Sequence, residues 1–243
     1  MADIRDQIRE FWDHDAETYD QSPSHALTDP VEAAAWRALL RRHLPPPPAH
    51  VLDAGAGTGA ITALLLDLGY RATALDISSA MLDRARTKLA GRDVEFVVAP
   101  ADEPPPGPFD AVVERHVLWT NPDPVRTLAA WREVAPEGRL VAMEGLGPST
   151  IERRVRFAFA SLVRRVLDVP HDHHDHYGED VVRALPLLHA RTPAPLLGAA
   201  RRAGWKGRRV ERLRDVEWAR RMIAPTLISR LESTPLFAVV ADA

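Results

Sequence analysis

Short strands and helices alternate along most of this chain, and the alternation constrains the fold more than any other feature of the sequence. Between residues 50 and 144, apolar strand-like runs are separated by helical patterns and bounded by glycine and proline. The predicted strands are 51–53, 71–76, 94–98, 109–113 and 139–144, and the predicted helices between them are 60–68, 79–90 and 122–134. Alternation at this spacing is typical of a parallel sheet with helices wound on both faces.

The C-terminal part of the chain adds to the same sheet. Two more strands are predicted at 208–213 and 236–241, with a helical stretch at 217–231 between them. Two short helices are predicted before them, at 179–185 and 194–203. We therefore expect an α/β protein with a doubly wound, mostly parallel sheet of seven strands.

The 243 residues suit a single domain with additions to its sheet. Residues 4–19 and 30–43 have helical patterns, and four consecutive prolines at 45–48 predict a hinge into the core. Four parts are expected within 1–243. They are an N-terminal helical cap at 1–45, a ligand-binding core at 46–146, a helical lid inserted after the fifth strand at 147–200, and a C-terminal strand pair with a helical insert at 201–243.

Composition excludes several kinds of protein. The chain carries 31 basic and 34 acidic residues, a net charge of −3, which argues against a general nucleic-acid binder. It has no cysteine, so disulfides, thiol nucleophiles and thiolate metal sites are excluded. No apolar run approaches the roughly 18 residues of a membrane span. The N-terminus is charged and has no apolar signal core, so we expect a cytoplasmic protein without nucleic-acid or membrane partners.

A glycine-rich turn follows the first strand of the core and is the most informative segment for function. It reads Val-Leu-Asp-Ala-Gly-Ala-Gly-Thr-Gly over residues 51–59. Glycines after a strand let the backbone turn tightly and let a ligand lie on main-chain N–H groups. Asp76 ends the next predicted strand, where its carboxylate can accept hydrogen bonds from both hydroxyls of a ribose. Asp53, two residues before the first glycine, could reach a ligand ammonium group.

Two other interpretations of this turn stay open. Gly55, Gly57 and Ala60 also satisfy the dinucleotide form of the motif, which would indicate a nicotinamide-dependent oxidoreductase. The sequence shows no Tyr-x-x-x-Lys or comparable set for hydride transfer. A tight turn that holds no ligand is the other interpretation.

With these residues the chain resembles the class I S-adenosylmethionine-dependent methyltransferases that act on small molecules, the methyltransferase type 11-like family. The resemblance covers about residues 8–146 and implies a Rossmann-like fold, with S-adenosyl-L-methionine as cofactor and S-adenosyl-L-homocysteine as product. It also implies a cofactor site. In that site Asp76 would hold the ribose, Ile77 would pack on the adenine, and the loop for the methionine part would consist of Asp53, Gly55, Gly57 and Gly59.

The adenine side departs from the family's usual sequence. Pro100 stands where the family usually has an aspartate. The N–H of Ala101 would still meet the adenine ring. Asp102 would either take over the contact with the adenine amine or be a solvated loop acid.

The resemblance also implies roles for residues past the fourth strand and in the cap. Arg115 would contact the cofactor. His116 could act as a general base, bind the substrate, or bond only to cofactor or backbone. Tyr19 would reach the cofactor or the reacting methyl group, and Trp12 and His14 are expected on the substrate side.

A run of histidine and aspartate occupies residues 171–176 of the lid, just before Tyr177. Imidazole and carboxylate together can bind first-row metals, but the spacing supplies no further ligand and we expect no metal. A pocket role for one or two histidines and a plain polar loop are the alternatives. We expect His174 and Tyr177 to contact substrate and His176 to take part in catalysis.

The expected function is transfer of a methyl group from S-adenosylmethionine to an O, N or C atom of a small-molecule metabolite by in-line displacement. The arginine-rich, lysine-poor composition suggests a GC-rich bacterial genome and, with the resemblance, secondary metabolism. The alternative is a protein that binds the cofactor without methyl transfer, or uses it in another reaction. The chain could form a homodimer.

Overall fold

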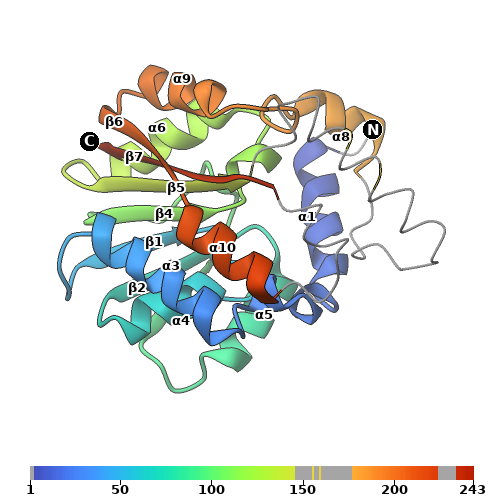
Figure 1. Ribbon diagram of the computed structural model, residues 1–243. Helices are drawn as coiled ribbons and strands as arrows, with labels where there is room; N and C mark the ends of the chain where they lie inside the picture. The colour runs from blue at the N-terminus through green and yellow to red at the C-terminus, as the bar shows by residue number, and fades with distance from the viewer. Residues whose placement is uncertain (1–2, 146–154, 156–158, 160–176, 224–233) are drawn as a thin grey trace.

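A computed structural model describes residues 3–145, 155, 159, 177–223 and 234–243. A seven-stranded sheet runs through the middle of the molecule (Figure 1), in the order β3-β2-β1-β4-β5-β7-β6. The strands are β1 (His50–Ala54), β2 (Arg71–Asp76), β3 (Val94–Val98), β4 (Ala111–Arg115), β5 (Arg139–Gly145), β6 (Lys206–Arg212) and β7 (Leu236–Asp242). All neighbours are parallel except β7, which runs antiparallel to both β5 and β6. The predicted doubly wound fold is confirmed.

Helices cover both faces of the sheet, as Figure 1 shows. They are α1 (Ile4–Asp15), α2 (Pro23–Ala26), α3 (Pro30–His43), α4 (Ala60–Asp67), α5 (Ser79–Lys88), α6 (Pro124–Val134), α8 (Glu179–Ala184), α9 (Ala194–Arg202) and α10 (Arg214–Ile223). Two 3₁₀ turns are η1 (Tyr19–Gln21) and η2 (Leu118–Thr120). Successive strand residues point to opposite faces. Val51 therefore joins the core under α3, α4 and α10, and Leu52 joins the core under α6 and α9.

Three helices begin at the capping residues that the sequence offers. Asp29 and Asp123 each accept hydrogen bonds from two backbone N–H groups and are each followed by proline, at the starts of α3 and α6. Ser78 accepts from the N–H of Met81 at the start of α5. Such caps satisfy donors that have no partner inside the helix. The cap of α5 follows Asp76 by two residues and so helps to fix the end of β2.

Some predicted boundaries are wrong by a few residues. The first helix ends at Asp15 and not at Tyr19, because Thr18 donates to the Asp15 carbonyl in a tighter turn that leads into η1. The fourth strand is 111–115 and not 109–113, because the Phe109 N–H donates to Val134 at the end of α6 instead of joining the sheet. β6 begins two residues earlier than predicted. The C-terminal helix begins at Arg214, three residues earlier.

The N-terminal cap lies over the carboxyl ends of the parallel strands. Ile8 of α1 is buried against Val181 and Leu185, which belong to α8 and its end. The cap is therefore packed against a segment that follows β5 by more than thirty residues. The described part of the chain holds no helix that could cross a membrane. The proposed division of 1–243 into cap, core, lid and strand pair stays a prediction.

Candidate active site

A cavity opens at the carboxyl ends of β1, β2 and β4, beneath α1. The empty space inside it is about 1010 Å³, a figure that includes its opening to solvent. Its walls come from the glycine turn, the ends of β2 and β4, the loop at 100–102, η2 with the start of α6, and α1. In open parallel sheets, ligands bind at this edge.

The glycine turn after β1 allows close approach but offers few free donors. Gly55, Gly57 and Gly59 all have positive φ angles, of 74°, 54° and 80°. A Cβ on Gly55 would overlap the side chain of Val117, whereas a Cβ on Gly57 would point into open space, 4.0 Å from Tyr19 Cε1. The N–H groups of the three glycines and of Ala56 all donate within the protein. The expectation that a ligand lies directly on these N–H groups stays a prediction, and in this structure the groups are engaged within the protein.

Asp76 lies at the end of β2 and lines the cavity beside Ile77. Its Oδ2 accepts from the N–H of Gly57 at 2.8 Å, and its Oδ1 accepts from the N–H of Ser78 at 2.9 Å. Each oxygen keeps a lone pair for a further donor. Burial raises the pKa of Asp76 to about 6. The carboxylate is thus held rigidly where two ribose hydroxyls could reach it.

Asp53 and Gly59 belong to the motif but do not line the cavity. The Asp53 side chain is buried beneath the turn, where its Oδ2 accepts from the Thr62 hydroxyl at 2.6 Å. Burial raises the pKa of Asp53 to about 6 as well. Gly59 precedes α4, and its missing side chain leaves room for Ala85 and Leu89 of the neighbouring helix. In this structure Asp53 and Gly59 therefore support the conformation of the glycine turn.

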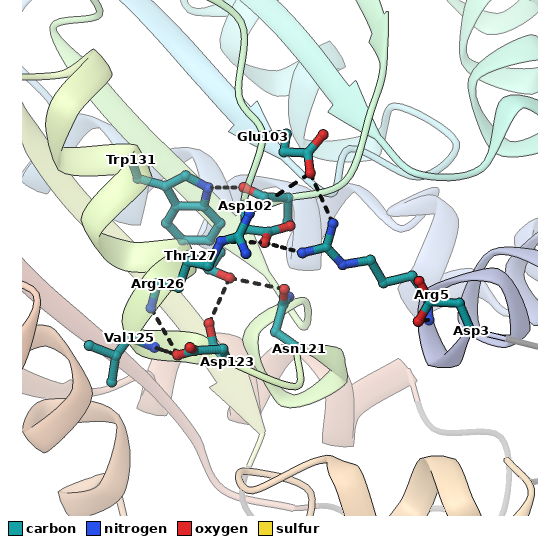
Figure 2. Close-up of polar contacts among 11 residues, drawn as sticks. Asp3, Arg5, Asp102, Glu103, Asn121, Asp123, Val125, Arg126, Thr127 and Trp131 are labelled. Carbon is teal, nitrogen blue, oxygen red and sulfur yellow. Dashed lines mark hydrogen bonds and ion pairs between the residues drawn. The ribbon is translucent and has the colours of Figure 1, made fainter.

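Asp102 sits at the far wall of the cavity in a network of charged groups (Figure 2). Its carboxylate accepts from Arg5 of α1 at 2.5 Å and from Nε of Arg126 in α6 at 3.0 Å. Glu103 pairs with Arg5 at 2.9 Å. The indole N–H of Trp131 donates to the Ala101 carbonyl at 2.7 Å. Asp102 and Ala101 both line the cavity, and their contact with an adenine ring stays a prediction.

Sequence reasoning missed the two arginines of this network. Arg5 lies 97 residues before Asp102 in the chain, and no local pattern links them. Arg5 extends from α1 to Asp102 and Glu103, as Figure 2 shows, and it lines the cavity.

The end of β4 and the cap form the opposite wall, which contains Tyr19, Arg115 and His116. The guanidinium of Arg115 donates to the carbonyls of Ser24 and His25, which holds the chain of α2 against the strand. The Tyr19 ring stacks on His25 at 4.3 Å between centroids. Burial raises the pKa of Tyr19, so its hydroxyl stays protonated at neutral pH. Trp12 of α1 lines the same side, edge-on to Tyr19.

His116 directly follows β4 and has a positive φ of 63°, which is uncommon for a residue with a side chain. Its Nδ1 accepts a hydrogen bond from the N–H of Gly145 at 3.2 Å. Burial, together with the nearby charges of Arg220 and Arg115 and the His25 ring, lowers the pKa of His116 well below its usual value. The imidazole is therefore neutral at physiological pH.

Of the remaining residues expected at the site, those that the structure describes do not line the cavity. His14 is exposed in the last turn of α1 and does not line the cavity. Tyr177 does not line it either, because its ring packs among Phe11, Trp12 and Trp119. His174 and His176 lie outside the described residues. Among the residues that are described, no group of three or more histidines and carboxylates could hold a metal.

Residues 52–142 match the family model of the methyltransferase domain. The chain is 34% identical over 143 residues to a demethylmenaquinone methyltransferase of Clavibacter sepedonicus, which covers 57% of this chain and 58% of that protein. It is 33% identical over 201 residues to a malonyl-[acyl-carrier protein] O-methyltransferase of Laribacter hongkongensis, covering 74% and 63% of the two proteins. The chain thus spans about three-fifths of the length of these relatives.

A solved structure shares the fold across nearly the whole molecule. It is the 1,6-didemethyltoxoflavin-N1-methyltransferase of Burkholderia thailandensis, bound to 1,6-didemethyltoxoflavin and S-adenosylhomocysteine, with a TM-score of 0.60 and 20% identity over 100% of this chain and 91% of that one. These likenesses do not support the dinucleotide interpretation of the glycine turn. Residues 52–142 therefore belong to the methyltransferase domain family, and the named relatives that match beyond them are methyltransferases as well.

Proposed function

We propose that this protein transfers a methyl group from S-adenosylmethionine to a small-molecule acceptor. The observation that carries the proposal is the pairing of the Asp76 carboxylate with the glycine turn at 2.8 Å inside a large cavity. A rigid carboxylate beside a bare backbone suits a ribose and its substituents. The family match over residues 52–142 supports the same cofactor.

The residues present fit such a cofactor along the whole length of the cavity. Asp76 would accept from the ribose hydroxyls, and Ile77 and Ala101 would border the adenine. Gly57 faces open space where any side chain would intrude. Arg115 is in none of the ion pairs formed by the described residues, yet it lines the cavity, so its charge is available to a ligand carboxylate.

Bound S-adenosylmethionine supplies a methyl group on a cationic sulfur, which a lone pair of the acceptor can displace in line. The protein's part is to hold the acceptor close and aligned and to keep water out, and positioning alone can supply much of the rate. Trp12 and Tyr19 close the cavity from the cap with aromatic surface. His116 reaches the cavity as a neutral imidazole, which can bind an acceptor without repelling the sulfonium.

A small metabolite is the favoured acceptor class. The relatives are named for a demethylmenaquinone and for a malonyl group on a carrier protein, and the solved structure holds a toxoflavin precursor. The acceptor atom, a role in bacterial secondary metabolism, a cytoplasmic location and a homodimer stay predictions from the sequence.

Calorimetry with S-adenosylmethionine, S-adenosylhomocysteine and NAD tests the proposal first. Micromolar binding of the first two compounds and none of NAD is the expected result. Panels of quinols, carboxylic acids and heteroaromatic amines are then screened for S-adenosylhomocysteine formation by mass spectrometry. A folded protein that binds neither sulfur compound would contradict the proposed function.

A further inference from the structure

Two buried carboxyl side chains lie side by side just below the wall of the cavity that His116 forms. Glu114 is in β4 and Glu144 is in β5, the neighbouring parallel strand. Glu114 has 0% and Glu144 has 5% of its surface exposed. Neither lines the cavity, and the cofactor site described above uses neither. Buried acids without a structural counterion are uncommon in proteins.

Each of these carboxyl groups is satisfied at only one oxygen. Glu114 Oε2 accepts from the Val117 N–H at 2.9 Å, and Glu144 Oε1 accepts from the Trp119 N–H at 3.2 Å. Glu114 Oε1 and Glu144 Oε2 have no hydrogen-bond partner among the described residues. An unpaired buried oxygen is costly when it carries charge and much less costly when it carries a proton. The geometry therefore favours protonated carboxyl groups at neutral pH.

The electrostatic environment of Glu114 and Glu144 also favours their protonated forms. Burial raises the pKa of Glu114, and the charge of Glu144 raises it further. Burial raises the pKa of Glu144 to about 8. The two groups titrate as a pair, because ionisation of one opposes ionisation of the other.

The unpaired oxygen of Glu144 is next to His116. Glu144 Oε2 lies 3.6 Å from His116 Nδ1, which is too long for a hydrogen bond. Nδ1 instead accepts the N–H of Gly145, the residue after Glu144. A neutral imidazole whose Nδ1 accepts must carry its proton on Nε2. Because Nδ1 is held at the strand, the proton-bearing nitrogen is on the ring edge that is free to face the cavity.

From these contacts we propose that Glu144 is a positioning residue that sets which ring nitrogen of His116 carries the proton. While Glu144 is protonated, His116 offers an Nε2–H donor to the acceptor. When Glu144 ionises, the imidazole proton moves from Nε2 to Nδ1 and is donated to the carboxylate, the hydrogen bond from the Gly145 N–H to Nδ1 is given up, and Nε2 becomes a lone-pair base. The inference rests on the proposed function, since it gives His116 an acceptor to bind.

The Nε2–H form of His116 also limits the class of acceptor that the site can bind. A donor at Nε2 suits an acceptor atom that presents a lone pair, such as a carboxylate, an enolate, a phenolate or a neutral amine nitrogen. An acceptor that must lose a proton in the transfer needs the second state, in which Nε2 takes that proton. The charged and titratable groups that face His116 are Arg115 of β4, Arg220 of α10, His25 of α2 and Glu144 of β5. Glu114 lies beside Glu144, whose charge raises the pKa of Glu114.

Nitrogen NMR of the full chain labelled with ¹⁵N-histidine tests the proposal without any turnover. The His116 signals are assigned by loss in His116→Asn and followed from about pH 6 to about pH 10, a range that spans the ionisation of a raised carboxyl pKa. We expect the Nε2–H form at the low end and growth of the Nδ1–H form as pH rises. An Nδ1–H form already at the low end would overturn the proposal.

Two variants with different expected effects separate positioning from mere packing. Glu144→Gln cannot ionise, so the change of tautomer is lost. Glu114→Gln keeps an uncharged group beside Glu144, as the protonated Glu114 does, so the change of tautomer is kept near the pH of the wild type. Unchanged titration of His116 in Glu144→Gln would refute the role of Glu144. If one variant does not fold, the wild-type titration and the other variant still decide.

Cofactor binding to each protein is measured in parallel by calorimetry. If S-adenosylmethionine binds to none of these proteins, the proposed function is refuted. The tautomer titration is measured in the free protein and tests the role of Glu144 independently of that result.

Discussion

The carboxylate of Asp76 accepts the backbone N–H of Gly57 at 2.8 Å, and this single bond ties the end of β2 to the middle of the glycine turn. Two parts of the cofactor site are thereby fixed relative to each other before any ligand binds. A preorganised site loses less free energy on binding because little has to be ordered.

Replacement of Asp76 by alanine removes both the tie to Gly57 and the acceptor for the ribose. We expect S-adenosylmethionine affinity to fall by about 1–3 kcal/mol, the usual loss when an acceptor is removed. Calorimetry measures it, and Asp110→Ala is the matched control. Asp110 also accepts a backbone N–H at a strand end, from His50 at 2.7 Å, but does not line the cavity. Equal affinities of Asp76→Ala and wild type would refute the ribose assignment.

Cofactor affinity should depend on pH through Asp76. Burial raises the pKa of Asp76 to about 6, so the group loses its charge as pH falls through that value. Hydroxyl donors bind an ionised carboxylate more strongly than a neutral one, and the affinity should therefore weaken below about pH 6, approaching tenfold per pH unit. Asp76→Asn should bind weakly with a flat profile between pH values on either side of 6. An equally steep profile in that variant would assign the dependence to another group.

Asp53 should affect folding stability in a predictable direction. Burial raises its pKa from 3.8 to about 6, so between these values the folded protein holds a proton that the unfolded chain has lost. Stability therefore falls as pH rises through this window, and the loss is complete above it. Asp53→Asn keeps an oxygen for the Thr62 hydroxyl but cannot ionise. The free energy of unfolding in urea is measured at both ends of the window. The difference between the two pH values should be smaller by roughly 2–3 kcal/mol in the variant than in the wild type. The same difference in both proteins would contradict the assignment.

Two glycine substitutions separate backbone strain from ligand exclusion. Gly57 and Gly91 both have positive φ angles, of 54° and 78°, and a Cβ on Gly91 would meet nothing within 4 Å. Alanine at either position should cost about 1–2 kcal/mol of folding stability. Only Gly57→Ala places a methyl group in the cavity, so only this variant should lose cofactor affinity. Equal affinities of the two variants would show that the cofactor does not approach Gly57.

The ion pair from α1 to the 102–103 loop should slow the exchange of cofactor. Arg5 reaches from the cap to Asp102 and Glu103, while Arg126 contacts the same Asp102 from α6, within the core. We expect Arg5→Ala to speed cofactor dissociation several-fold and to reduce its salt dependence, since screening already weakens such partly exposed pairs. Arg126→Ala is the control and should change the rate less. Stopped-flow fluorescence of Trp12, which lines the cavity, would follow the release; equal rates in both variants would exclude a cap-specific effect.

Periodicity and turn residues were enough to predict the sheet and the helices packed on it, whereas the place of the cofactor stays a prediction. Asp76 was identifiable because it ends the strand that follows the glycine turn and its helix. The N–H partners of that turn were not predictable, since Leu75 and Asp76 accept them only after β1 and β2 are paired. The boundary of β4 was missed because Phe109, an apolar residue in a strand-like run, belongs to the end of α6 by its hydrogen bond.

The contacts of the charged groups around the cavity could not be predicted from the sequence for a different reason. Arg5 meets Asp102 only because α1 folds over the core, and Glu114 meets Glu144 only because β4 and β5 are neighbours. Burial gives these side chains their chemistry, and burial of a polar residue cannot be read from a local pattern.

The position of β7 affects how the protein can be made. Within the described sheet β6 has β7 as its only neighbour, and β7 follows it in the chain by more than twenty residues. On the ribosome, where domains acquire structure from the N-terminal side at about 5–20 residues per second, the strands from β1 to β5 can pair as they emerge. β6 has no partner until residues 236–242 have been synthesised. β7, the last strand of the sheet to be translated, is therefore the strand that joins the edge strand β6 to the rest of the sheet.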